Sequence, residues 1–238
     1  AGGETTTTGA ATTSPPTTAA PAGGGTITIA IQPQYKSFDP ARAGEIDGMM
    51  VNYACYDTLV RSDAGQIKPW VAASWETQDD GKTYIFKLRD DVTFNSGAKL
   101  TAEDVVFSFN RLKNVKGSPS FQTDPIVSVE AVDASTVKIV LKDVDASFLA
   151  RISVPTFAIT EAKVVKEHGG TDAADADKAD QAQAWLDTNS AGSGPYMLTE
   201  YVNKQQAVLT ANKNYWGPDK PKFDKIVLKQ IDDVNTQK

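Results

Sequence analysis

The sequence has almost none of the residues that most often carry catalysis or bind metals. Its 238 residues include one cysteine, Cys55, and one histidine, His168. A single cysteine excludes both an intramolecular disulfide and a cysteine-based zinc site within the chain. Cys55 stands between tyrosines and is interpreted as a small buried side chain. His168 precedes two glycines, which predicts that a helix ends there. A positive charge on His168 would interact favourably with the dipole at the helix C-terminus.

Basic clusters and long apolar runs are missing as well. The net charge is -6 and the pI is near 4.9, which argues against nucleic acid or an anionic membrane surface as the main partner. No apolar run approaches the roughly 18 residues that a membrane-spanning helix needs. With 40% apolar residues, an acidic globular protein with one sizeable core or two modest ones is expected.

Residues 1–25 consist almost wholly of Ala, Gly, Thr, Ser and Pro. Such a segment cannot bury enough surface to offset the entropy of ordering it, so it is predicted to be a flexible tether with a reach of about 25 to 30 Å. Because the chain begins at Ala1, one hypothesis is a secreted protein that has lost its signal peptide and a lipidated anchor. A plain disordered tail remains the alternative.

The remaining sequence alternates between predicted strands and helices. Period-two alternation, Asp-Gly and other turn residues, and helical apolar spacing are the signals. Strands are expected at 26–31, 196–202, 206–210 and 225–231, hairpins at 74–77 with 83–89 and at 127–132 with 136–141, and helices at 41–60, 148–154 and 161–167.

The stretch 88–109 organises a strand, a glycine turn and a capped helix without any residue suited to catalysis. Thr101 is the expected N-cap. The free amides of the first turn and the helix dipole stabilise the acidic residues that follow it. Val105, Phe109 and Leu112 follow at helical spacing and form one apolar stripe. This pattern indicates a scaffold for binding.

Three patterns that resemble chemical sites lack the parts those sites need. The acidic segment 172–187 has no turn glycine and no bidentate carboxylate at the required place for calcium, so a solvated helix face is expected. Gly192 and Gly194 precede a strand, whereas a phosphate loop needs a helix N-terminus. The neighbouring carboxylates Glu103 and Asp104 point apart, which disfavours a hydrolase. We therefore expect no catalytic residue, no metal site and no cofactor.

Several motifs together carry a resemblance to a known family. They are the stretch 88–109, Ser74-Trp75-Glu76 with Asp80-Gly81, Ser37-Phe38-Asp39-Pro40-Ala41, Ser193-Gly194-Pro195-Tyr196 and Asn214-Tyr215-Trp216. In this order and spacing the chain resembles the extracellular solute-binding proteins of family 5, the dipeptide, oligopeptide and nickel-chelate receptors of ABC importers. Because members of that family are roughly twice as long, the chain is expected to be an N-terminal portion.

The resemblance implies a mixed α/β fold, one lobe of the type II periplasmic-binding-protein kind with an inserted hairpin-rich subdomain and with the second lobe absent. The implied division is a tether at 1–25, an incomplete lobe I at 26–48 and 190–238, and the inserted subdomain at 49–189. The two lobes of such receptors close around a solute. A lone lobe should therefore bind weakly or not at all.

The implied function is a non-enzymatic receptor, expected to be a monomer, that delivers a peptide or similar small polar solute to an ABC permease. The implied location is extracellular, as a lipoprotein tethered to the surface of a Gram-positive bacterium and touching the membrane only through its lost anchor. A nickel chelate, a sugar or an opine as solute, and a signalling or structural surface module, remain alternatives.

Candidate solute-binding residues come from two loops, since ligands of open α/β sheets lie beyond the carboxyl ends of strands. After the strand 26–31 these are Gln34, Tyr35, Ser37, Phe38 and Asp39. The second loop supplies Gly194, Pro195 and Tyr196, where the glycine would let backbone approach a ligand. Equally open is a structural role, with Phe38 in the core, Asp39 as a cap and Pro40 at a helix start.

Overall fold

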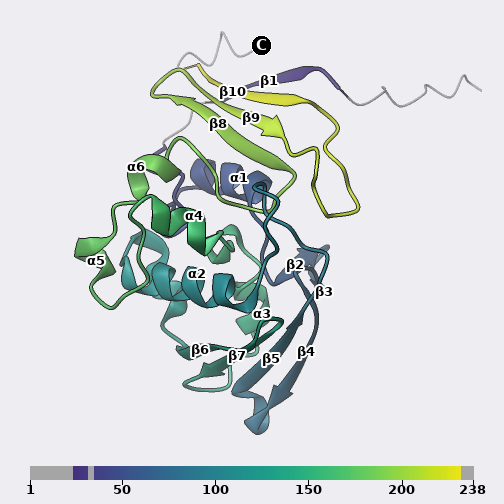
Figure 1. The fold of residues 1–238 in the computed structure, drawn as a ribbon, viewed down its shortest axis with the longest axis vertical. Coiled ribbons are helices and arrows are strands. Elements are labelled where there is room, and N and C mark those ends of the chain that lie inside the picture. Colours follow the sequence, from purple (N-terminus) through teal and green to yellow (C-terminus); the bar gives the residue numbers. More distant parts are fainter. Residues whose placement is uncertain (1–23, 32–34, 232–238) are drawn as a thin grey trace, which may run out of the picture.

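The computed structural model describes residues 24–31 and 35–231, so the predicted tether and Gln34 lie outside the described residues. Within these residues, ten strands form three sheets (Figure 1). The first sheet contains β1 (Thr26–Ile31), β10 (Lys225–Gln230), β9 (Gln206–Ala211) and β8 (Tyr196–Val202), in that order. β1 runs parallel to β10 and the other pairs are antiparallel. The first and last described strands are thus neighbours.

The second large sheet is fully antiparallel and lies at the opposite end of the molecule (Figure 1). Its order is β4 (Ala72–Gln78), β5 (Thr83–Leu88), β7 (Thr136–Leu141) and β6 (Ile126–Asp133). A small hairpin of β2 (Val60–Asp63) and β3 (Gln66–Pro69) leads into it. Both predicted hairpins are confirmed, although the first turns through a short 3-10 helix, Asp79–Gly81.

Helices lie between the two large sheets (Figure 1). The longest are α1 (Ile46–Cys55) and α2 (Ala102–Asn114), followed by α3 (Phe148–Arg151), α4 (Ala162–Glu167), α5 (Ala176–Ala179) and α6 (Gln183–Leu186). Short 3-10 helices cover Ser118–Thr123 and Pro155–Phe157. None of the helices within the described residues has the length and apolar character that crossing a membrane requires.

The predicted helix over 41–60 is wrong at both ends. Its first residues form a turn in which the Asp39 carbonyl accepts hydrogen bonds from the amides of Arg42 and Ala43. At the other end, Tyr56 is extended and Val60 already belongs to β2. These boundaries are set by contacts with distant segments, which apolar spacing does not record.

The acidic segment 172–187 is also not the solvated helix face that was expected. It contains the short helices α5 and α6. Asp180, between them, is only 7% exposed and its carboxylate binds Arg111 of α2. A buried carboxylate with a guanidinium partner has no signature in the spacing of acidic residues along the chain.

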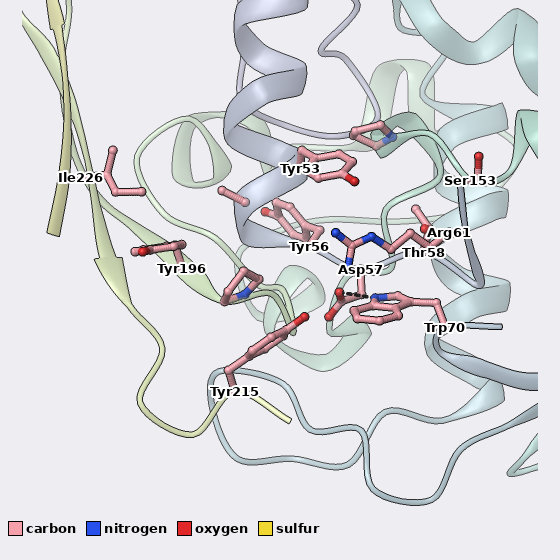
Figure 2. A pocket seen from close by; sticks show the side chains of 13 residues that line it. Tyr53, Tyr56, Asp57, Thr58, Arg61, Trp70, Ser153, Tyr196, Tyr215 and Ile226 are labelled. Carbon is pink, nitrogen blue, oxygen red and sulfur yellow. Dashed lines mark hydrogen bonds between the residues drawn. The ribbon is translucent and has the colours of Figure 1, made fainter. Parts of the chain in front are cut away.

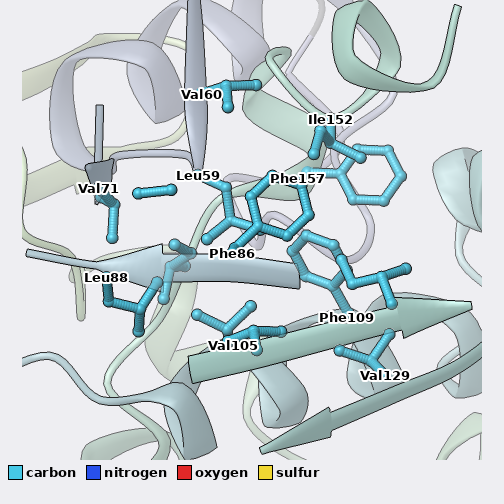
Figure 3. Packing of buried hydrophobic residues seen from close by; sticks show 14 of the residues in the cluster. Leu59, Val60, Val71, Phe86, Leu88, Val105, Phe109, Val129, Ile152 and Phe157 are labelled. Carbon is cyan, nitrogen blue, oxygen red and sulfur yellow. The ribbon is translucent and has the colours of Figure 1, made fainter. Parts of the chain in front are cut away.

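The main core fills the space between α2 and the antiparallel sheet, as Figure 3 shows. Phe86 on β5 is fully buried, and its strand neighbours Tyr84 and Leu88 share the same buried face. Val105 and Phe109 supply the apolar stripe of α2 that was predicted. A second cluster joins α1 to β8 and β9. The two clusters meet along the chain at 55–59, where the cavity described below is found.

We expect Thr101→Ala to lower the free energy of unfolding by about 1 kcal/mol, the usual effect of losing an N-cap. The Thr101 amide and hydroxyl both donate to one carboxylate oxygen of Asp104, at 2.9 Å each. Urea denaturation measures the change, with Ser62→Ala on exposed β2 as the control. A loss no larger than that of Ser62→Ala would contradict the capping role.

Candidate functional site

A cavity of about 190 Å³ opens at the C-terminal end of α1 (Figure 2). The rings of Tyr53, Tyr56, Trp70, Tyr196 and Tyr215 line it, together with smaller apolar and polar side chains. Asp57 and Arg61 bring the two charges. These residues come from four separate parts of the chain, and the fold alone brings them together.

Close backbone packing holds the cavity wall in place. The Gly194 amide donates to the carbonyl of Cys55, at the end of α1, over 3.1 Å. A Cβ atom at Gly194 would lie 2.5 Å from the carbonyl carbon of Cys55 and 2.7 Å from the amide nitrogen of Tyr56. The glycine therefore lets the end of α1 touch the loop before β8, and it places Pro195 and Tyr196 at the cavity.

Asp57 organises the aromatic side of the cavity. The residue is only 5% exposed. Its carboxylate accepts hydrogen bonds from Trp70 Nε1 at 2.7 Å, Ser193 Oγ at 2.7 Å and Trp216 Nε1 at 2.9 Å. Burial raises the pKa of Asp57, and these three hydrogen bonds only partly oppose the shift. Both indole rings are thereby fixed, with centroids 5.2 Å apart.

Arg61 extends from the start of β2 over the face of Trp70, with its guanidinium carbon 4.7 Å from the ring centroid. In Figure 2 the guanidinium lies between Tyr53 on one side and Asp57 and Trp70 on the other. Among the described residues it has neither a carboxylate within 4.0 Å nor a side-chain hydrogen bond. The cavity thus presents a stacked cation with its donors free.

Most residues of the predicted loop after β1 have structural contacts. Phe38 is 2% exposed and packs against Tyr35 and Tyr201. The Ser37 hydroxyl donates to Asp187 over 2.6 Å. Asp39 is buried, accepts the Ala41 amide and binds Arg111.

These contacts match the structural alternative for Phe38 and Asp39, whereas Pro40 lies six residues before the start of α1 and does not begin it. Of the predicted residues that the structure describes, only Pro195 and Tyr196 line the cavity. Solute contact by any of the eight residues stays a prediction.

The sequence interpretation did not select Tyr53, Asp57, Arg61, Trp70 or Tyr215. Tyr53 lies in the helix predicted over 41–60, where it was expected to supply an apolar contact, and Tyr215 with Trp216 was interpreted as packing rather than as stacking on a solute. One signal was available, since an acid and an arginine four residues apart directly follow the helix. Nothing in that spacing, however, brings Trp70 or Tyr215 beside them.

A family model described as "Bacterial extracellular solute-binding proteins, family 5 Middle" matches residues 66–238. The chain is 34% identical over 208 residues to the "Probable D,D-dipeptide-binding periplasmic protein DdpA" of Escherichia coli, covering 85% of this chain and 38% of that protein. It is 31% identical to the "Nickel-binding periplasmic protein" of the same organism, covering 79% and 34%. The chain thus spans less than half the length of these curated relatives.

Solved structures give the same likeness. The Campylobacter jejuni NikZ in complex with Ni(L-His) has a TM-score of 0.75 and 27% identity, over 89% of this chain and 40% of that one. The Helicobacter pylori DppA in complex with the peptide STSA also has a TM-score of 0.75 and 27% identity, over 90% and 44%. These neighbours are type II periplasmic binding proteins. The predicted mixed α/β fold is confirmed, and this part of a chain corresponds to a single lobe.

Proposed function

Since this chain belongs to the bacterial extracellular solute-binding proteins of family 5, we propose that it is part of a receptor that captures a peptide, or a similar small polar solute, and passes it to an ABC importer. The family match carries this proposal. Several relatives are named for dipeptides or di- and tripeptides, which favours peptides over other solutes. The family consists of receptors, which agrees with the prediction of a protein that is not an enzyme.

The aromatic cavity at the end of α1 is our proposed contact for the solute. Rings and a few convergent polar groups are typical of small-molecule sites, and about 190 Å³ is less than the roughly 300 to 1,000 Å³ of a complete one. Tyr53, at its edge, continues an apolar stripe of α1 through Met50 and Ile46, which are 54%, 46% and 78% exposed. A second lobe closing over this face would complete the burial.

The division into lobe I and an inserted subdomain at 49–189 remains part of the proposal, and it places the cavity at their junction. Tyr196 and Tyr215 come from the part assigned to lobe I, and Asp57 and Trp70 from the inserted part. We further propose that residues 1–25 tether the receptor, as a monomer, to the surface of a Gram-positive cell through a lipid. Mass spectrometry of the native N-terminus tests the lipid.

Calorimetry on the protein encoded by the whole gene tests the function. Di- and tripeptides are expected to bind, with a nickel–histidine chelate, a sugar and an opine as the competing solutes. If only the nickel–histidine chelate binds, the receptor function stands but the solute is a metal chelate and not a peptide, in line with the nickel-binding protein among the relatives. Absence of binding to any of these solutes would contradict the receptor function.

A further inference from the structure

Arg61 differs from every other arginine in the protein. The chain has five arginines. Arg42, Arg89, Arg111 and Arg151 each have a carboxylate within 4.0 Å, whereas Arg61 has none among the described residues. A guanidinium offers five N–H donors in a planar fork that matches a carboxylate. Its donors therefore remain available to a molecule in the cavity.

Asp57, the acid that shares the cavity with Arg61, is not a substitute for such a partner. Burial and three hydrogen bonds have the larger effects on the pKa of Asp57, and the charge of Arg61 lowers that pKa by a smaller amount. Both oxygens of Asp57 are already engaged: Oδ1 accepts from Trp70, and Oδ2 accepts from Ser193 and Trp216. These bonds hold the carboxylate to the indoles, away from Arg61.

The guanidinium is also held in place before any ligand arrives. It stacks on Trp70, whose Nε1 is anchored to Asp57 and whose ring packs on Trp216. A side chain fixed in this way loses little rotamer freedom on binding. Stacking on the indole face leaves the edge of the guanidinium, where its N–H groups lie, free to face the cavity.

The rest of the cavity determines which chemical group of the solute can adjoin the bound carboxylate. Tyr53, Tyr196 and Tyr215 supply ring faces, and Pro195 and Ile226 supply apolar surface. We propose that this cavity binds the carboxylate of a solute whose adjoining group is aromatic or apolar, with Arg61 as a two-pronged anchor. This inference rests on the proposed function and narrows the class of solute. If the solute is a peptide, the inference requires a free C-terminal carboxylate on an apolar C-terminal residue.

The test uses small probes that need only the cavity. 3-Phenylpropionate and its uncharged amide, 3-phenylpropionamide, are titrated into the purified protein encoded by the whole gene while the indole N–H resonances are followed by NMR. We expect the acid to bind at least tenfold more tightly than the amide, because hydrogen bonds between charged groups are the stronger kind. Inorganic phosphate, which lacks the apolar group, is expected to leave the resonances unchanged at equal concentration.

Arg61→Gln is expected to reduce the acid-to-amide ratio to about one. Arg89→Gln is the matched control, since Arg89 also stacks on a tryptophan, Trp216, at 5.3 Å but has Asp91 as its partner and does not line the cavity. It should preserve the ratio. Equal binding of acid and amide by the unmodified chain, no binding of the acid, or tighter binding of phosphate would each overturn the proposal without any variant.

The failure of this inference and of the receptor function are distinguishable. If peptides bind the whole protein in calorimetry but the probes show no preference for the acid, the function stands and the role of Arg61 is wrong. If the probes show the preference and its loss in Arg61→Gln while no peptide binds, the cavity is a carboxylate site of a protein with another role.

Discussion

Replacing Arg111 with methionine is expected to lower the free energy of unfolding by about 3 to 5 kcal/mol, the range observed when one member of a buried ion pair is removed. Arg111 is almost completely buried on α2 and joins two acids from distant segments. Its two Nη atoms bind Asp39 at 2.7 Å each, and its Nε and Nη2 bind Asp180 at 2.8 Å each. Methionine would leave two buried carboxylates without that partner.

Urea denaturation at pH 7 measures the loss, and Lys116→Met is the control. Lys116 binds Asp177 at the surface, with side chains 61% and 25% exposed, so its removal should change stability by less than about 1 kcal/mol. Adding Asp39→Asn and Asp180→Asn to Arg111→Met should recover part of the loss, because the charges that need a partner are then gone. A loss for Arg111→Met as small as that for Lys116→Met would show that the network does not stabilise the fold.

The pH dependence gives this prediction a second measurement. Burial alone would raise the pKa of Asp180, but hydrogen bonds from Arg111 and its charge outweigh burial and lower it. The stabilisation from such a group is present above its unfolded pKa, about 3.9, and is lost as the pH falls through the folded value. The difference in stability between the native chain and Arg111→Met should therefore shrink as the pH is lowered from 7 toward 3.

Gly194→Ala is expected to lower the free energy of unfolding by about 3 kcal/mol, at the upper end for overpacking. The new Cβ would lie 2.5 to 2.7 Å from backbone atoms of residues 54–56, and backbone in a packed junction cannot move aside as a side-chain tip can. Gly194 does not have a left-handed backbone, so the loss comes from contact alone.

Gly65→Ala is the matched control for that substitution. Gly65 has a φ of 80° and no atom within 4 Å of its added Cβ, so only conformational strain of about 1 kcal/mol is expected. Thermal or urea denaturation without any solute compares the two. Unchanged stability of Gly194→Ala, together with lost solute binding, would instead favour the sequence-based interpretation in which this glycine admits a ligand.

Local structure was predictable from the sequence because it depends on neighbours along the chain. The stripe of Val105 and Phe109 and the cap at Thr101 were read from spacing, and both hairpins from their turns. By contrast, Arg111 meets Asp39 across 72 residues and Asp180 across 69. A charge in the last turn of a helix and an acid in a polar segment each look solvated until the fold brings them together.

The candidate cavity was harder to predict for the same reason. The motif Gly194-Pro195-Tyr196 was selected because its glycine would let backbone approach a ligand, whereas the atoms closest to a Cβ at Gly194 are backbone atoms of residues 54–56. Asp57 lies in the segment 41–60 that was interpreted as helix, and Arg61 directly follows that segment, so a continued helix would place them on one face at i and i+4. In the extended conformation found there, Asp57 reaches Trp70 and Trp216 while Arg61 covers Trp70.

The parallel pairing of β1 with β10 has a consequence for how the protein is made. The hydrogen bond from Gly25 to Asp224 at this pairing spans 199 residues, so β1 leaves the ribosome long before its neighbour exists. At about 5 to 20 residues per second, the wait is roughly 10 to 40 s. The buried members of the main core all lie between Leu59 and Ile159. We therefore expect the antiparallel sheet and α2 to fold first, and β1, although it is synthesised before them, to be among the last elements to find its place.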